Sequence, residues 1–167
     1  MHRAIVFAEA ILTLVSASGA FAQTPQRTTA TYDDWVVRCE MGGVAKICEM
    51  TQSTQVKGQP EPITLIAIGR QAKNGPVKIV FKIPVNVWLP AGAKLTTDDN
   101  KDDVAAGFSR CTPAGCFAET DIKDSLVKKL RGLTTNGKLQ FKDAGEHDVA
   151  VPVSFKGFGD AFDAMQK

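Results

Sequence analysis

The chain has 167 residues, of which 44% are hydrophobic and 23% are charged, and its formal net charge is +2. That length fits one domain and is sufficient to bury a useful core. Positive and negative side chains are interleaved along the chain without a basic stripe, so we expect no nucleic-acid partner and no dedicated membrane-surface binding.

The first 22 residues have the pattern of a secretory signal peptide. Arg3 supplies a basic start, residues 4–15 are largely apolar, and residues 20–22 fit the small-x-small rule for cleavage, which we place after Ala22. The apolar run is well short of the ~20 residues that span a bilayer. No second apolar run follows, so we expect no transmembrane segment in the mature chain. A buried N-terminal helix is the alternative interpretation.

Four cysteines fall in the expected mature chain: Cys39, Cys48, Cys111 and Cys116. An even number of cysteines behind an export signal favours disulfide bonds. Of the three connectivities open to four cysteines, we prefer the first with the second and the third with the fourth. The first pair brackets Gly42 and Gly43, and the second brackets Pro113 and Gly115, all of which favour turns. A zinc site is the rival interpretation, although such sites normally show a tighter C-x2-C spacing.

The first half of the mature chain predicts a polar lead-in followed by strands. Residues 23–31 are polar and are expected to be flexible, so the domain begins near Tyr32. Apolar and polar residues alternate over 35–40 and 47–51, which predicts a hairpin with the first two cysteines on its inward face. Residues 63–69 form a nearly continuous apolar run, typical of a strand that is buried on both sides or lies near the sheet centre.

A long half-buried strand is predicted over residues 77–89, where every odd-numbered position is apolar. Pro84 interrupts this pattern, and because proline cannot donate a ladder hydrogen bond we expect a bulge, a break or a sheet edge there. Trp88 lies on the even-numbered face of the same segment. We favour packing of Trp88 in the core over the alternative, an aromatic anchor on an exposed binding surface.

The second cysteine pair is predicted to close another hairpin, which residues 104–110 enter and residues 117–118 leave. A short helix should follow, capped by Thr120 or Asp121 and ended by Gly132. The apolar residues of this helix are spaced four apart: Ile122, Leu126 and Leu130.

The end of the chain predicts a closing hairpin and a second helix. Residues 138–142 and 149–155 alternate on either side of a turn. A short helical segment that should pack on the core has three apolar residues on one face: Phe158, Phe162 and Met165. Together the elements predict a mainly β fold, an antiparallel β-sandwich-like single domain of residues 32–167. It has one short helix after the second cysteine pair and a short C-terminal helix.

The sequence predicts no catalytic, cofactor-binding or metal-binding residues. His147 is the one histidine of the expected mature chain, and it lies in a turn without a nucleophile motif, so we interpret it as a solvated turn residue. Carboxylates such as Glu40, Glu49 and Glu119 could act as an acid and base pair. Nothing in the sequence brings two of them together.

An acidic loop follows the long strand and raises the question of calcium. Asp98, Asn100 and Asp102 are spaced like the first three ligands of an EF-hand loop. The sixth position is Asp103 instead of glycine, and the twelfth is Ser109 instead of glutamate. We therefore favour a solvated loop and leave calcium binding open. The residues that we assign to a candidate binding surface are Trp88, Asp98, Asp99 and Asp102.

Five segments of the mature chain carry a family resemblance, and they follow one another over almost all of its length. They are Asp34-Trp35-Val36-Val37-Arg38-Cys39, Cys48-Glu49-Met50-Thr51-Gln52, Leu89-Pro90-Ala91-Gly92, Cys111 with Gly115-Cys116-Phe117-Ala118, and Val153-Ser154-Phe155-Lys156-Gly157-Phe158. In this ordered set and its cysteine spacing, the chain resembles the invasion-associated locus B family of exported bacterial proteins. Phe155 departs from the leucine that much of the family has at this position.

The resemblance implies a periplasmic, outer-membrane-associated or secreted protein, linked in pathogenic relatives to entry into host cells. Relatives also occur in bacteria that invade nothing, so a general role in the envelope fits as well. The resemblance supplies no catalytic residues. Our first hypothesis is therefore a non-enzymatic envelope protein that binds a protein or an envelope component. The alternative is a small secreted hydrolase or enzyme inhibitor whose carboxylate site forms only in the fold.

Overall fold

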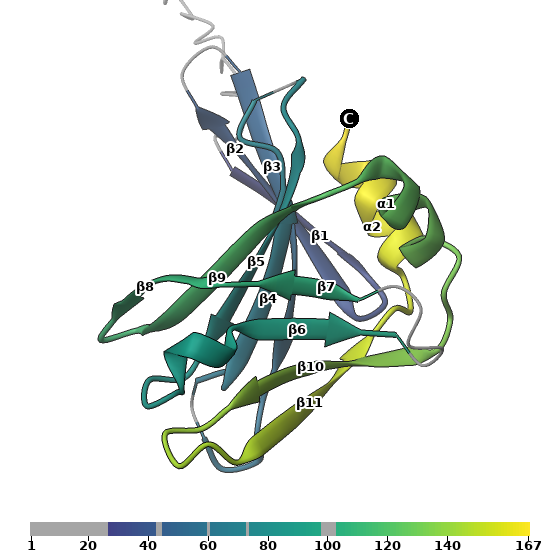
Figure 1. The fold of residues 1–167 in the computed structure, drawn as a ribbon. Coiled ribbons are helices and arrows are strands. Elements are labelled where there is room, and N and C mark those ends of the chain that lie inside the picture. Colours follow the sequence, from purple (N-terminus) through teal and green to yellow (C-terminus); the bar gives the residue numbers. More distant parts are fainter. Residues whose placement is uncertain (1–26, 43–44, 60, 73, 98–102) are drawn as a thin grey trace, which may run out of the picture.

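The computed structural model describes residues 27–42, 45–59, 61–72, 74–97 and 103–167, which form two antiparallel sheets (Figure 1). The seven-stranded sheet has the order β1 (Arg27–Tyr32), β2 (Trp35–Gly42), β3 (Ala45–Thr54), β4 (Thr64–Gly69), β5 (Val77–Ile83), β9 (Gly115–Ile122) and β8 (Phe108–Thr112). The four-stranded sheet has the order β11 (Asp148–Ser154), β10 (Asn136–Lys142), β6 (Ala93–Thr96) and β7 (Val104–Ala106). The remaining elements are α1 (Asp124–Leu130), α2 (Phe158–Met165) and the 3-10 turn η1 (Leu89–Ala91). The predicted mainly β, sandwich-like fold with two short helices is confirmed.

The two-residue period of the strands places the core between the layers. On β5, Val77, Ile79, Phe81 and Ile83 are buried, while the alternate side chains on the other face are partly exposed. The four-stranded sheet and the helices cover this inner face (Figure 1). Buried side chains from both sheets and both helices form one hydrophobic core, so the elements are held together as a single unit.

Trp35 lies at a junction between β2, β3 and the end of β11. Its indole Nε1 donates a hydrogen bond to the carbonyl of Ser154 at 3.0 Å, and its ring meets that of Phe158 edge to face, with centroids 5.2 Å apart. The carboxamide of Gln52 donates to the same Ser154 carbonyl at 2.8 Å and accepts from the Ser154 backbone N–H at 2.8 Å. The Ser154 hydroxyl donates to Asp34 at 2.6 Å. This junction ties the last strand to the second and third.

Both preferred disulfides are present. Cys39–Cys48 joins β2 to β3 with an S–S distance of 2.06 Å, and Cys111–Cys116 joins β8 to β9 with an S–S distance of 2.04 Å. In each hairpin the two cysteines lie directly opposite each other in the strand register. No cysteine is free, so the rival zinc interpretation is wrong.

Strand β1 corrects the predicted lead-in. Arg27–Tyr32 pairs along its whole length with β2, so residues 27–31 belong to the sheet instead of preceding it. Their side chains are all exposed, and a strand without a buried face lacks the apolar alternation that reveals a strand in a sequence. The predicted signal peptide, residues 1–22, lies outside the described residues.

The predicted long strand ends at Ile83, immediately before Pro84. The chain then leaves the larger sheet, with a positive φ of 65° at Asn86. The backbone N–H of Trp88 donates to the carbonyl of Lys142 on β10 at 3.0 Å. Trp88 is consequently 40% exposed, and the core packing that we favoured for it is wrong. The alternation is therefore a reliable indicator of burial only as far as the proline.

Helix α1 begins later than the sequence predicts. Residues 120–122 continue β9, in which Ile122 lies opposite Val77 of β5, and Lys123 is the N-cap residue instead of Thr120 or Asp121. Strand pairing between distant segments here outweighs the local capping preference. The helix itself forms, and Leu130 is fully buried, as its spacing predicts.

The C-terminal helix α2 packs against β1, β2 and β3. Its buried residues include the three predicted from their spacing: Phe158, Phe162 and Met165. The helix follows Gly157, which has a φ of 80°, and a Cβ at this position would collide with the carbonyl oxygen of Tyr32. Arg131, just beyond α1, forms an ion pair with Asp163 of α2 at 2.6 Å. The predicted packing of the chain end on the core is confirmed.

Candidate functional site

The outer face of the seven-stranded sheet has no second layer within the described part of the chain. The four-stranded sheet and the helices lie on the opposite face (Figure 1). Strand register brings Arg38 of β2, Glu49 of β3, Gly69 of β4 and Lys78 of β5 into one row across this outer face. Two depressions lie on this face, the first bordered by Arg38 and the second by Glu49, Gly69 and Lys78, and we define them together as the outer-face site.

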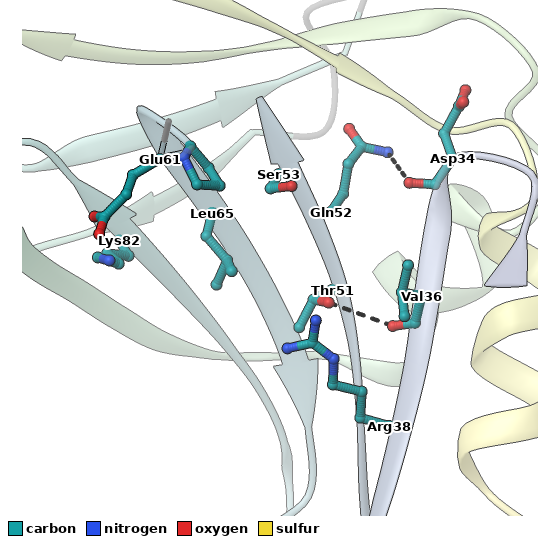
Figure 2. Close-up of a pocket in the computed structure, with 10 residues that line it drawn as sticks. Asp34, Val36, Arg38, Thr51, Gln52, Ser53, Glu61, Leu65 and Lys82 are labelled. Atoms are coloured by element: carbon teal, nitrogen blue, oxygen red, sulfur yellow. Dashed lines mark hydrogen bonds between the residues drawn. The ribbon is translucent and has the colours of Figure 1, made fainter. Parts of the chain in front are cut away.

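The first depression has a volume of about 530 Å³. Its floor includes Thr51, whose hydroxyl donates to the carbonyl of Val36 at 3.4 Å. Figure 2 shows Arg38 beside Thr51 and, across the depression, Glu61 and Lys82. Arg38, Glu61 and Lys82 form no ion pair with any other described residue. Their charges are therefore available to a ligand.

The second depression, of about 520 Å³, lies over the end of β4. Its floor is low because β4 contributes only the small residues Ala67 and Gly69 to the outer face at this end, between longer side chains of β3 and β5. Glu49 and Glu119 both line it. Arg110 completes one side, with its guanidinium 4.5 Å from the centre of the Phe117 ring. Two of the three carboxylates that the sequence left apart thus line one depression, on strands that β4 and β5 separate.

The third carboxylate, Glu40, lies elsewhere and pairs with Arg27 at 2.6 Å. Sequence reasoning also missed the cations of the outer-face site, Arg38, Lys82 and Arg110. One sequence feature could have indicated the second depression, namely the pair of small residues Ala67 and Gly69 within an otherwise bulky apolar run. Small side chains on one face of a strand leave a depression between their neighbours.

A separate apolar surface lies at the connection between β5 and β6. Val85, Trp88 and Leu89 are 46%, 40% and 49% exposed, respectively. The segment is held to β10 by the hydrogen bond from Trp88 and by an isolated bridge between Val87 and Asp143. Of the candidate binding residues from the sequence, Trp88 is therefore on the surface. Asp98, Asp99 and Asp102 lie outside the described residues.

The turn between β10 and β11 contains His147. His147 is exposed, and its Nδ1 lies 3.1 Å from the Asp143 carboxylate, which also accepts from the His147 backbone N–H at 3.0 Å. These two hydrogen bonds, the backbone one first, lower the pKa of Asp143 from its usual 3.8. On the same turn, a hydrogen bond to Asp148 is the largest cause of a raised pKa for Lys142. Within this turn, therefore, Asp143 pairs with His147 and Lys142 pairs with Asp148.

The described residues contain no group of three or more His, Cys, Asp or Glu side chains positioned to hold a metal ion. In the same part of the chain, no helix has the length and apolar character needed to cross a membrane.

Comparison with known proteins gives a consistent result. The family model described as invasion associated locus B (IalB) protein matches residues 35–166. Two invasion protein B homologs, from Brucella abortus strain 2308 and from Brucella abortus biovar 1 strain 9-941, are each 32% identical over 168 residues, which cover 99% of this chain and 96% of the relative.

A solved structure has the same fold. The crystal structure of invasion associated protein B from Bartonella henselae matches with a TM-score of 0.72 at 24% identity, covering 83% of this chain and 94% of that chain. The family model spans most of the chain and the Brucella relatives align over nearly its full length, as the ordered cysteine-containing segments predicted. The chain belongs to the invasion-associated locus B family.

Proposed function

We propose that this protein is an exported, non-enzymatic envelope protein that binds another protein or an envelope component through the outer-face site. The observation that carries this proposal is the set of charges of both signs around depressions in an uncovered sheet face, of which Arg38, Glu61 and Lys82 have no ion-pair partner among the described residues. Such a surface favours a partner with complementary charges, because an interface gains specificity and orientation from matched charges.

The proposed location is the periplasm or the outer membrane, or the exterior after secretion. The two disulfides support it, because disulfides form and persist in oxidising compartments outside the cytoplasm. The signal-peptide pattern of residues 1–22 supports it independently. The names of the Brucella and Bartonella relatives refer to invasion. Because this chain belongs to the same family, the proposal includes a contribution to host-cell entry or to envelope homeostasis.

Charge reversal on the outer-face site tests the proposal. Wild-type protein and the double variant Arg38→Glu/Lys82→Glu are used to capture partners from detergent-solubilised envelopes, and each captured partner is then purified and titrated against both proteins. We expect the double variant to bind the partner at least about tenfold more weakly, because each reversed charge repels its former counterpart.

The matched control is Lys128→Glu/Lys138→Glu, which makes the same change in net charge on α1 and β10, away from the outer-face site. Both side chains are exposed. The control should bind as the wild type does. Equal binding by all three proteins, or equal loss in the two double variants, contradicts the proposed surface.

A carboxylate-based hydrolase or enzyme inhibitor is the second candidate function. It is favoured by the common position of Glu49 and Glu119 in one depression. The test is an assay of ester, peptide and glycoside hydrolysis, and of inhibition of the matching hydrolases, with wild type and Glu49→Gln/Glu119→Gln. Activity that this substitution removes would replace the binding proposal, whereas a partner bound equally by wild type and this variant supports binding.

A further inference from the structure

Strand β1 is an open edge of the seven-stranded sheet. Within the described residues it pairs with β2 on one side only, through six consecutive residue pairs without a register shift. The connection to β2 is the two-residue turn Asp33-Asp34, with a φ of 47° at Asp33. In such hairpins the pair that closes the turn, here Tyr32 and Trp35, is hydrogen-bonded. The backbone groups of Arg27, Thr29 and Thr31 therefore point to the open edge.

The other three sheet edges in the described residues are each protected. β8 has a register irregularity between Phe108 and Arg110 and is closed by a disulfide. β7 has only three residues. β11 contains Pro152, and its end is hydrogen-bonded to Gln52 of β3. Short strands, bulges and prolines all prevent strands from adding to an edge. Among these four edges, β1 alone has none of these devices.

The charge pattern of β1 is compatible with a second copy of itself. Its one charged residue, Arg27, is already paired with Glu40 of the same sheet at 2.6 Å. In an antiparallel pair of β1 strands, outward-pointing residues must lie opposite outward-pointing residues. The registers that meet this condition with the largest overlap place Thr29 opposite either Thr29 or Thr31 of the second copy. Neither places like charges opposite each other, and cross-strand threonine pairs are favourable.

We propose that two copies of this protein associate through antiparallel pairing of their β1 strands, which joins the two seven-stranded sheets. The interface is isologous, with a two-fold axis perpendicular to the sheet. Both outer faces then lie on the same side of one continuous sheet. A dimer therefore presents two copies of the outer-face site to a partner, and simultaneous engagement of both increases the apparent affinity without any new contact.

Sedimentation velocity over a series of protein concentrations tests this proposal with the signal-free domain. The wild type should shift from monomer to dimer as its concentration rises. Thr29→Pro removes one outward donor from each copy, and the loss of two ladder hydrogen bonds should weaken association at least about tenfold. The monomer tolerates this proline because the N–H that it replaces points away from β2.

Two further variants secure the result. Thr29→Val/Thr31→Val retains the backbone donors and the strand-favouring shape, so it should dimerise as the wild type does. Thr29→Lys/Thr31→Lys places like charges opposite each other in both registers and should be monomeric, which decides the matter if the proline variant fails to fold. A wild type that stays monomeric throughout, or a dimer that neither Thr29→Pro nor the lysine pair weakens, overturns the proposal.

The dimer is independent of the proposed binding function. Arg38→Glu/Lys82→Glu leaves every backbone donor of β1 in place; Arg38 lies opposite Thr29 on β2 and projects from the outer face instead of toward the open edge, and Lys82 lies on β5. It should therefore dimerise as the wild type does while losing the partner. Thr29→Pro should keep one functional site per monomer and bind the same partner, with the affinity of a single site. Failure of one proposal thus leaves the other testable by its own measurement.

Discussion

Gln52 holds the end of β11 against β3 with both ends of its carboxamide. The group donates to the Ser154 carbonyl and accepts from the Ser154 N–H, each at 2.8 Å. Gln52→Ala leaves the Ser154 N–H in a partly buried position without this partner, while the Ser154 carbonyl keeps only its hydrogen bond from Trp35. We expect the free energy of unfolding to fall by about 1–3 kcal/mol, measured by urea denaturation with the disulfides intact.

Gln140→Ala is the control for Gln52→Ala. Gln140 is an exposed glutamine on β10, so its loss should change the free energy of unfolding by less than about 0.5 kcal/mol. Equal unfolding midpoints for the two variants would show that the Ser154 contacts add no stability.

At the scale of an element, the turn between β10 and β11 has a defined response to pH. The His147 hydrogen bonds lower the pKa of Asp143 below 3.8 in the folded protein. Stability from this group is therefore present above pH 3.8 and is lost as the pH falls through the folded value. An NMR titration of the Asp143 carboxyl carbon should give a midpoint below 3.8 in the wild type.

His147→Ala separates the two contributions to that pKa. The substitution removes the ring contact but keeps the backbone N–H, which is the larger cause. The Asp143 midpoint should rise and still remain below 3.8. A wild-type midpoint at or above 3.8, or a variant identical to the wild type, contradicts the role of His147.

The elements that the sequence predicted correctly are those with one buried face. β5 shows this most clearly, because its alternate residues from Val77 to Ile83 form the core. Three predictions failed where a different interaction decided the structure. β1 has no buried face, Trp88 is redirected beyond Pro84 to β10, and residues 120–122 pair with β5 instead of capping α1. The last two failures involve pairing with a distant segment, which local patterns do not encode, whereas β1 pairs with the adjacent β2 and shows no apolar alternation.

At the scale of the whole molecule, three of the segments that carried the family resemblance meet at one place. Trp35 from the first segment and Gln52 from the second both bond Ser154 of the last, and Phe158 of the last packs on Trp35. The family signature in these segments therefore has a structural explanation. It specifies how the two sheets and α2 are joined.

The outer-face site, in contrast, depends on the whole molecule. Ala67 and Gly69 belong to the apolar run of residues 63–69, which was correctly predicted to lie near the centre of a sheet. Whether their face is covered depends on where the four-stranded sheet packs, and that is set by contacts between distant elements. The sequence could therefore supply the residues of the site, but not their exposure.

The shared core predicts that both sheets unfold together. Trp35 is buried at the junction and Trp88 is 40% exposed, so Trp88→Phe leaves a fluorescence reporter of the junction alone. In urea, with the disulfides intact, its emission and the far-UV circular dichroism should change with the same midpoint, as in a two-state transition. The reason is that Trp35 contacts Ser154 and Phe158, so the junction cannot open without releasing β11 and α2 from the core.

The reciprocal variant, Trp35→Phe, retains only Trp88 and serves as the control. Because Trp88 is already partly exposed in the folded protein, its emission should change less than that of Trp35 during unfolding. A Trp35 transition at lower urea than the circular dichroism transition would mean that the junction opens before the sheets. In that case the hydrogen bonds to Ser154 would clamp two separable layers, and Gln52→Ala would shift the first transition without changing the second.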